Sequence, residues 1–105
     1  MCDQFEKYFG KSGNELDAHC SGLISCISVL KHQHNTEDEI KTMRDTIPHY
    51  FKELDKLNVT FRFQNAMIYI AEHYDVRMHY MRTLLIKAVE HAGGYENIYR
   101  KAEAN

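Results

Sequence analysis

Apolar residues recur at helical spacing along almost the whole of this 105-residue chain, and this period limits the possible folds more than any other feature. The first stripe consists of six residues: Leu16, Cys20, Leu23, Ile24, Ile27 and Leu30. Further stripes run from Ile40 to Leu57 and from Phe63 to Tyr74. Helices with one apolar face bury it against each other. The sequence therefore predicts an all-α fold, a compact orthogonal bundle of five or six helices with little or no sheet.

Local signals predict where the first helices begin. A short helix is expected at residues 3–9, followed by a break in "GKSGN" (10–14), whose Asn14 is a suitable N-cap for the first long helix. Thr36 and Glu39 have the T-x-x-E spacing of a capping box, which predicts a second long helix from residue 37.

The second half of the chain is predicted to hold further helices. One is expected from about Val76 to His91, ending at Gly93–Gly94, because glycine is favoured just after a helix C-terminus. A last helix is expected in "YENIYRKAEAN", with Tyr95, Ile98 and Tyr99 facing inward.

Two segments allow alternative predictions. Pro48 removes one helical hydrogen bond, so residues 37–57 form either one kinked helix or two helices joined near Thr46; the continuing apolar phase favours the kink. "NVTFRF" (58–63) alternates apolar and polar residues as a strand does, but a helix capped by Asn58 or Thr60 also fits.

The chain is short enough to form one domain over residues 1–105. Its net charge is −2, which argues against a general nucleic-acid coat. Residues 1–58 hold ten acids and seven bases, whereas residues 59–105 hold five acids and six bases. An anion-binding surface is therefore expected in the second half.

The three cysteines, Cys2, Cys20 and Cys26, have no spacing typical of a disulfide framework. We find no secretory signal and no apolar run of the ~20 residues that span a bilayer. These features predict a protein of the reducing cytoplasm, with no membrane partner, in a bacterium, its phage or a eukaryotic cell.

The stretch from Ile70 to Val89 has the pattern of a helix-turn-helix unit. Such units place a small residue in the first helix, with apolar residues one before it and three, five, ten and thirteen after it. If Ala71 is the small residue, these positions hold Ile70, Tyr74, Val76, Met81 and Leu84, all apolar. This stretch, about twenty residues long, resembles helix-turn-helix DNA-binding proteins. It differs from them at Asp75, where the pattern usually has glycine.

The resemblance implies a small transcriptional regulator that binds double-stranded DNA as a dimer, as proteins of this class often do. The residues that would face outward from the second, recognition helix are Arg77, Met78, His79, Arg82 and Lys87. Arginine suits guanine edges and phosphates alike. Arg62 and Lys101 would add contacts to the DNA backbone.

The same stretch also supports a protein-binding function. Residues 76–89 are apolar on nearly all sides, which is typical of a core helix or an oligomer interface, here a homodimer. The alternative is a small acidic helical module, a stoichiometric inhibitor or adaptor of the kind that phages and mobile elements encode. Its contact residues would be Glu37, Asp38, Glu39, Tyr80 and Met81. A helix at 77–89 that is buried on all sides would exclude DNA binding.

No motif predicts an enzyme, a metal or a cofactor. The seven histidines include no H-x-x-x-H pair, and no C-x-x-C is present. Cys20 and Cys26 lie in or beside the first apolar stripe, where a buried structural cysteine is the expectation. The sequence contains no G-x-S-x-G and no glycine-rich phosphate loop.

Overall fold

The computed structural model describes residues 13–31 and 35–100, with side chains from Leu16 onward, and most of these residues are helical. The helical elements are α2 (Gly13–Lys31), α3 (Glu37–Lys56), α4 (Phe61–His73), η1 (Val76–Met78), α5 (Met81–His91) and η2 (Tyr95–Asn97). The all-α prediction is confirmed. The predicted number of five or six helices is wrong, because the described residues form four α-helices, η1 and η2 being single 3₁₀ turns. The short helix predicted at residues 3–9 lies outside the described residues.

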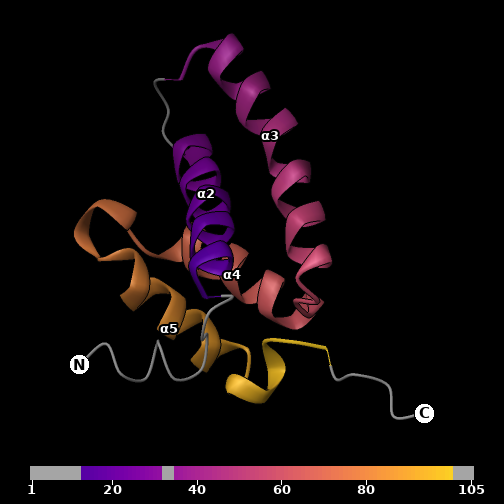
Figure 1. Cartoon of the computed structure of the whole chain (residues 1–105). Helices are drawn as coiled ribbons and strands as arrows, with labels where there is room; N and C mark the ends of the chain where they lie inside the picture. Colours follow the sequence, from indigo (N-terminus) through magenta and orange to yellow (C-terminus); the bar gives the residue numbers. More distant parts are fainter. Residues whose placement is uncertain (1–12, 32–34, 101–105) are drawn as a thin grey trace.

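Helix α2 is the centre of the fold and packs against α3, α4, α5 and η1 (Figure 1). Its stripe residues Leu16, Cys20, Leu23 and Ile24 are fully buried, as the helical spacing predicts. The helix begins at Gly13, so Asn14 lies inside it and is not the residue that precedes it. The apolar period was therefore a better guide to this helix than the predicted cap.

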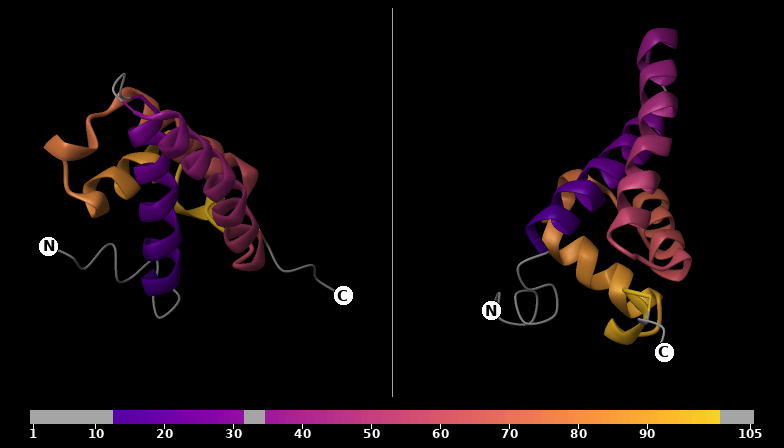
Figure 2. Two further views of the ribbon diagram at one scale, coloured as in Figure 1. Left: turned by 90° about the horizontal axis from the view of Figure 1, so that it is seen from above. Right: turned by 45° about the vertical axis from the view of Figure 1, so that its right-hand side comes forward.

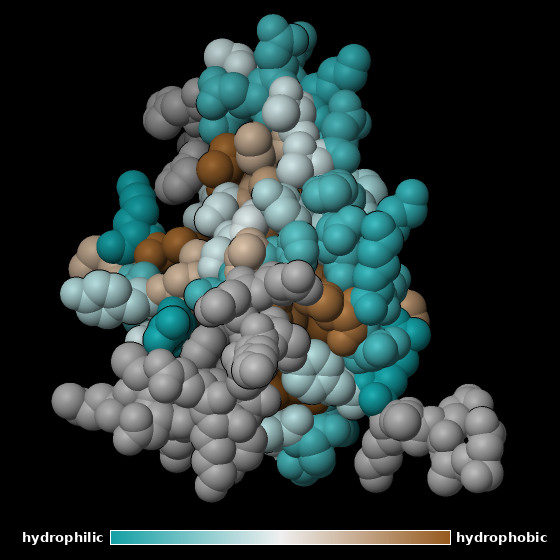
Figure 3. Space-filling model, viewed as in Figure 1, coloured by the Kyte–Doolittle hydropathy of each residue, from teal (hydrophilic) through white to brown (hydrophobic). Residues whose placement is uncertain are grey.

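Helices α2 and α3 form an antiparallel hairpin, and the N-terminal part of α3 extends past the rest of the molecule (Figures 1 and 2). The capping box is formed: the Glu39 amide donates to Thr36 Oγ1 at 3.2 Å, and the Thr36 amide donates to Glu39 Oε1 at 3.3 Å. The outer side of α3 is hydrophilic along its length (Figure 3). This helix therefore has one covered face and one face in water.

Pro48 lies inside α3, which is continuous from Glu37 to Lys56. Of the two alternatives, the one with two helices joined near Thr46 is therefore wrong. The apolar face supplies the physical reason, since Ile47 and Tyr50 on either side of the proline both pack against the core. Burial of that face outweighs the loss of one backbone hydrogen bond.

The alternating segment 58–63 leads into a helix. Helix α4 begins at Phe61, and the Phe63 amide donates to the Thr60 hydroxyl oxygen at 3.1 Å, so Thr60 is the predicted N-cap. The pairing of Val59 is limited to one antiparallel bridge with Tyr99. Asn58 precedes the bridge with a positive φ of 62°, a conformation that asparagine tolerates well.

The chain after α5 contains only the turn η2 within its described part, so the predicted last helix is wrong for residues 98–100. Backbone pairing with the start of α4 competes with a helix here: the Thr60 amide donates to Ile98 O at 2.9 Å, and the Arg100 amide donates to Asn58 O at 2.7 Å. Ile98 is buried, as predicted. Gly93 and Gly94 both have positive φ and end α5, which confirms the predicted stop.

The helix predicted from about Val76 to His91 begins only at Met81. The five residues before it contain the turn η1 and two extended residues. None of the helices within the described ranges combines the length and hydrophobicity needed to cross a membrane.

Candidate functional site

The connection between α4 and α5, residues 74–80, exposes large apolar side chains to water. Met78 has 76% of its surface exposed and Tyr80 has 87%. The other large apolar side chains exposed in the described part are Phe61 and Tyr69, both on α4. The connection therefore carries two such side chains only two residues apart.

Asp75 gives the connection its local shape. Its carboxylate accepts a hydrogen bond from the Arg77 amide at 3.0 Å, and its carbonyl accepts one from the Met78 amide at 3.0 Å. Aspartate side chains that bond nearby amides compete with α-helix formation. His79 and Tyr80 then have extended backbone, with ψ of 142° and 143°. This local turn explains why α5 begins five residues later than predicted.

The connection is held against the core by other side chains of the same segment. Tyr74 and Val76 pack against the core cluster. The ring of His79 meets the ring of Tyr74 edge-on with centroids 5.6 Å apart, and its Nδ1 lies 3.0 Å from Asp75 O. Since these residues point inward, Met78 and Tyr80 project from a backbone that is already anchored.

Lys31, the last residue of α2, anchors the start of the connection from another helix. Its ammonium group donates to Ala71 O at 2.8 Å and to Tyr74 O at 3.2 Å. The last carbonyl groups of a helix lack intrahelical partners and carry partial negative charge, so a cation is favoured there. Lys31 therefore stabilises the end of α4.

Aromatic stacking joins α4 to α5 beside the connection. Tyr69 lies between His73 and His91, with both ring centroids 4.0 Å from its own. Lys87 of α5 places its ammonium group 5.2 Å from the ring centroid of Tyr74, within cation–π range. These contacts fix α5, and hence its N-terminal residue Met81, relative to α4.

Three shallow hollows surround the connection. One of about 290 Å³ is lined, among the described residues, by Arg77, Met78, His79 and Tyr80. A second, of about 320 Å³, lies on the α2 side and includes Lys31 and Asp75. A third of about 340 Å³ lies on the α5 side and includes Tyr69 and Lys87. The surface is therefore open and uneven, and none of these hollows is an enclosed cavity.

Arg77 and Asp75 form a two-point ion pair, with Nε and Nη2 of the arginine 3.1 and 3.2 Å from the two carboxylate oxygens. The side-chain hydrogen bonds from Arg77 hold the pKa of the Asp75 carboxyl below its ordinary value, and the Arg77 amide lowers it further. The pKa of Arg77 is raised for the same reason. The pair is therefore ionised at neutral pH and has no net charge.

We expect the Asp75 carboxyl to titrate with a midpoint below its ordinary pKa of about 3.9. A lowered folded-state pKa means that the contribution of this carboxylate to stability is complete above that ordinary value and is lost as the pH falls through the lower one. The shift of the Arg77 amide resonance with pH would measure the midpoint. Arg77→Gln should raise the midpoint only in part, because the residue-77 amide still donates. A midpoint at or above the ordinary value would contradict the pairing.

The five residues predicted to face DNA do not lie on one helix. Arg77 and Met78 belong to η1 and His79 to the extended residues, while Arg82 and Lys87 lie on α5. The prediction that all five face outward from a single recognition helix is therefore wrong. The stretch 77–89 is not buried on all sides, since Arg77, Met78, Tyr80 and Arg82 are exposed. Arg62 is exposed at the opposite end of α4, and Lys101 lies outside the described residues.

The apolar positions of the helix-turn-helix pattern do lie inside. Ile70, Ala71 and Leu84 are buried in the core, and the pattern's remaining apolar residues pack against it: Tyr74, Val76 and Met81. The connection between the two helices has seven residues, 74–80, whereas helix-turn-helix units use about three or four. These six residues thus belong to the core or pack against it, and the connection is longer than in such units.

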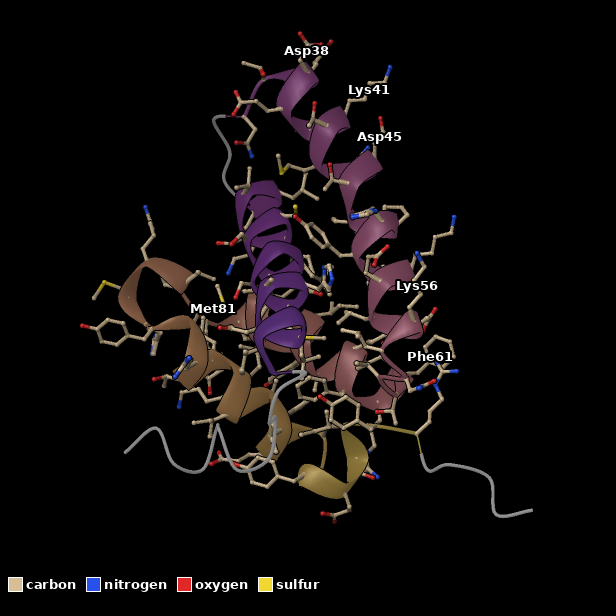
Figure 4. The ribbon with its side chains drawn as sticks, viewed as in Figure 1. Asp38, Lys41, Asp45, Lys56, Phe61 and Met81 are labelled. Atoms are coloured by element: carbon tan, nitrogen blue, oxygen red, sulfur yellow. The ribbon has the colours of Figure 1, made fainter. Side chains whose placement is uncertain are left out.

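The residues predicted for a protein contact fall on two separate surfaces. Glu37, Asp38 and Glu39 form the first turn of α3, and Tyr80 and Met81 lie at the start of α5. Figure 4 labels Asp38 and Met81 in different parts of the molecule, Asp38 at its upper end. The structure therefore does not bring these five residues together into one site.

The Cys20 and Cys26 side chains are buried, as expected for structural cysteines. Burial raises the pKa of the Cys20 thiol, so this group stays protonated at neutral pH, and Cys26 is shifted in the same direction for the same reason. Between residues 16 and 100, apart from the gap at 32–34, no three histidine, cysteine or acidic side chains gather closely enough to hold a metal ion.

Sequence reasoning missed two contributors to this region. Lys31 contacts carbonyl groups forty residues further along the chain, and no local signal could reveal that. The stacking of Tyr69 on His73 could have been found, because residues four apart share a helix face. No protein-family profile, curated protein or solved structure matches the chain.

Proposed function

We propose that this chain is a protein-interaction module whose contact surface is the docking segment, defined as residues 77–82. The observation that carries the proposal is the exposure of Met78 and Tyr80, at 76% and 87%, on an anchored connection. Single exposed apolar residues are common, but tyrosine and methionine flanked by arginine are typical of interface cores.

The anchoring of the segment supports a binding function. Association costs less when the contact residues are already held in place. Lys31 holds the end of α4, and Tyr74 and Val76 hold the connection against the core. The segment thus offers two large side chains with little backbone freedom left to lose.

Such a module would act as a stoichiometric inhibitor or an adaptor, and we propose the reducing cytoplasm as its compartment because Cys20 and Cys26 are free thiols. A homodimer through the same segment is one form that this function can take. Light scattering at tens of micromolar would test it, and a monomer there would exclude the dimer.

Selection from a displayed library of random dodecapeptides would test the protein-binding function. We expect peptides that bind the wild-type protein and lose at least about tenfold in affinity with Met78→Ser/Tyr80→Ser, as truncation of interface hot spots does. Phe61→Ser is the matched control, since Phe61 is 72% exposed and lies on the far side of the molecule from Met81 (Figure 4). Peptides that bind all three proteins equally would contradict the proposal.

DNA binding is the second candidate, and the burial of Ile70, Ala71 and Leu84 at the pattern positions favours it. A labelled random duplex followed by anisotropy would test it directly. A DNA-binding protein should bind at about 10⁻⁴–10⁻⁶ M, weaken steeply with salt, and lose affinity in Arg77→Ala/Arg82→Ala. Absence of binding at low salt would exclude this candidate.

A further inference from the structure

Tyr74, the residue that follows α4, is contacted from three other parts of the fold. Its carbonyl oxygen accepts a hydrogen bond from Lys31 of α2 at 3.2 Å, and its ring centroid lies 5.2 Å from the ammonium group of Lys87 of α5. The ring of His79, inside the docking segment, meets the Tyr74 ring edge-on. Tyr74 therefore links two helices to the docking segment. We call Lys31, Tyr74 and Lys87 the Tyr74 clamp.

The two lysines hold Tyr74 by different interactions. Lys31 also donates to Ala71 O at 2.8 Å, so its ammonium group bridges two carbonyl groups at the end of α4. Such carbonyl groups lack intrahelical partners and carry partial negative charge, which favours a cation. Lys87 approaches the aromatic ring instead, at a distance typical of a cation–π contact. The backbone and the ring of Tyr74 are therefore held from two different helices.

The Tyr74 clamp acts on the connection more than on the core. Lys31 is exposed and Lys87 is half-buried, and each lines one of the open hollows beside the connection. Interactions of charges in contact with water contribute little to the stability of a whole fold. The core cluster is formed by apolar side chains and contains neither lysine. Removal of an ammonium group should therefore release the connection and leave the helices folded.

We infer that Lys31 and Lys87 are positioning residues for the docking segment. Through Tyr74 they set the fraction of molecules in which this segment is held in its binding conformation. The inference rests on the proposed protein-binding function. Neither lysine belongs to the docking segment, so neither needs to touch the partner. When only a fraction of the molecules has the binding conformation, the apparent affinity falls by that fraction.

The kinetics of peptide binding distinguish a positioning residue from a contact residue. The probes are selected dodecapeptides whose binding depends on Met78 and Tyr80. Lys31→Met and Lys87→Met keep most of the aliphatic side chain and remove the ammonium group. We expect each to slow association about threefold, and the double variant about tenfold, with the dissociation rate unchanged. Met78→Ser/Tyr80→Ser should instead act mainly through faster dissociation, because it removes contacts with the peptide.

The motion of the connection in the free protein provides a second measurement, which needs no peptide. We expect NMR order parameters of about 0.85 for the backbone of residues 75–80, falling toward ~0.6 in the double variant. Lys31→Arg/Lys87→Arg keeps both cations and should keep the wild-type order parameters and association rate. Lys41→Met is the matched control, because Lys41 is exposed on α3, far from Met81 (Figure 4). Circular dichroism would verify that each variant keeps its helices, and the single variants serve if the double variant does not.

The outcomes separate this inference from the proposed function. If the order parameters or the association rate of the methionine variants stay at wild-type values, the positioning role is wrong and the protein-binding function stands. Faster dissociation in these variants would also overturn the inference, because it would make the lysines contact residues. An equal loss in the arginine variant would do the same, since the charge would then not be the cause. If no selected peptide depends on Met78 and Tyr80, the proposed function and this inference both fail.

Discussion

Replacing Phe63 by alanine is expected to lower the free energy of unfolding by about 3–5 kcal/mol. The Phe63 side chain is fully buried and is among the largest in the core cluster that joins α2, α4 and α5. Its removal loses apolar burial and leaves a cavity that the surrounding helices fill only in part. Urea unfolding followed by circular dichroism would measure the change.

Phe61→Ala is the matched control, on the same helix and with the same chemical change. Phe61 is 72% exposed, so its truncation should alter stability by no more than about 0.5 kcal/mol. The pair also tests the secondary structure. A strand would place both phenylalanines on one face, whereas a helix turns by about 200° over two residues. Equal costs for the two variants would contradict the helix.

This pair shows what the alternation in "NVTFRF" could and could not predict. The period of two was real, but it covered only six residues, too few to outweigh the helical spacing that starts at Phe63. The Thr60 hydroxyl decides the local outcome by capping α4. Val59 still forms a bridge, because Tyr99 from the far end of the chain lies beside it.

The main helices could be predicted because their signals are local. The stripe from Leu16 to Ile24 and the capping box at Thr36 depend on residues within a few turns of each other. The start of α5 could not be placed in this way. Val76–Val89 is apolar on nearly every side, so its periodicity does not indicate which residues face water. The structure exposes Met78 and Tyr80, because the turn made by Asp75 replaces the first helical turns.

The candidate site was predicted in composition but not in conformation. Tyr80 and Met81 were predicted as protein contacts, and Arg77, Met78 and Arg82 were predicted as DNA contacts; all of them except the half-buried Met81 are exposed. Their arrangement on the connection depends on two kinds of contact. Lys31 bonds to the backbone of a segment distant in sequence, and Tyr74 packs against a core that only the whole fold creates. The helix-turn-helix positions describe packing, and packed helix pairs of other functions satisfy them too.

Gly22→Ala is expected to lower the free energy of unfolding by about 1–3 kcal/mol, although alanine favours helices. Gly22 lies in the middle of α2, where it faces Tyr50 of α3. A methyl group at this position would lie 2.6 Å from the Tyr50 hydroxyl oxygen and nearer still to two of its ring carbons. Relief of this overlap requires the ring to move or the two helices to separate. Thermal or urea unfolding would measure the loss.

A double-mutant cycle with Tyr50→Ala identifies the cause. Without the ring, Gly22→Ala should stabilise the protein by up to about 1 kcal/mol, the ordinary gain of alanine over glycine inside a helix. The effect of the same substitution thus changes sign with the residue at position 50, as expected for two residues that contact each other. If Gly22→Ala is equally destabilising in both backgrounds, the close crossing of α2 and α3 at this point is wrong. If it is stabilising in both, the Tyr50 ring moves aside at little cost, and α2 and α3 are not held together by this contact.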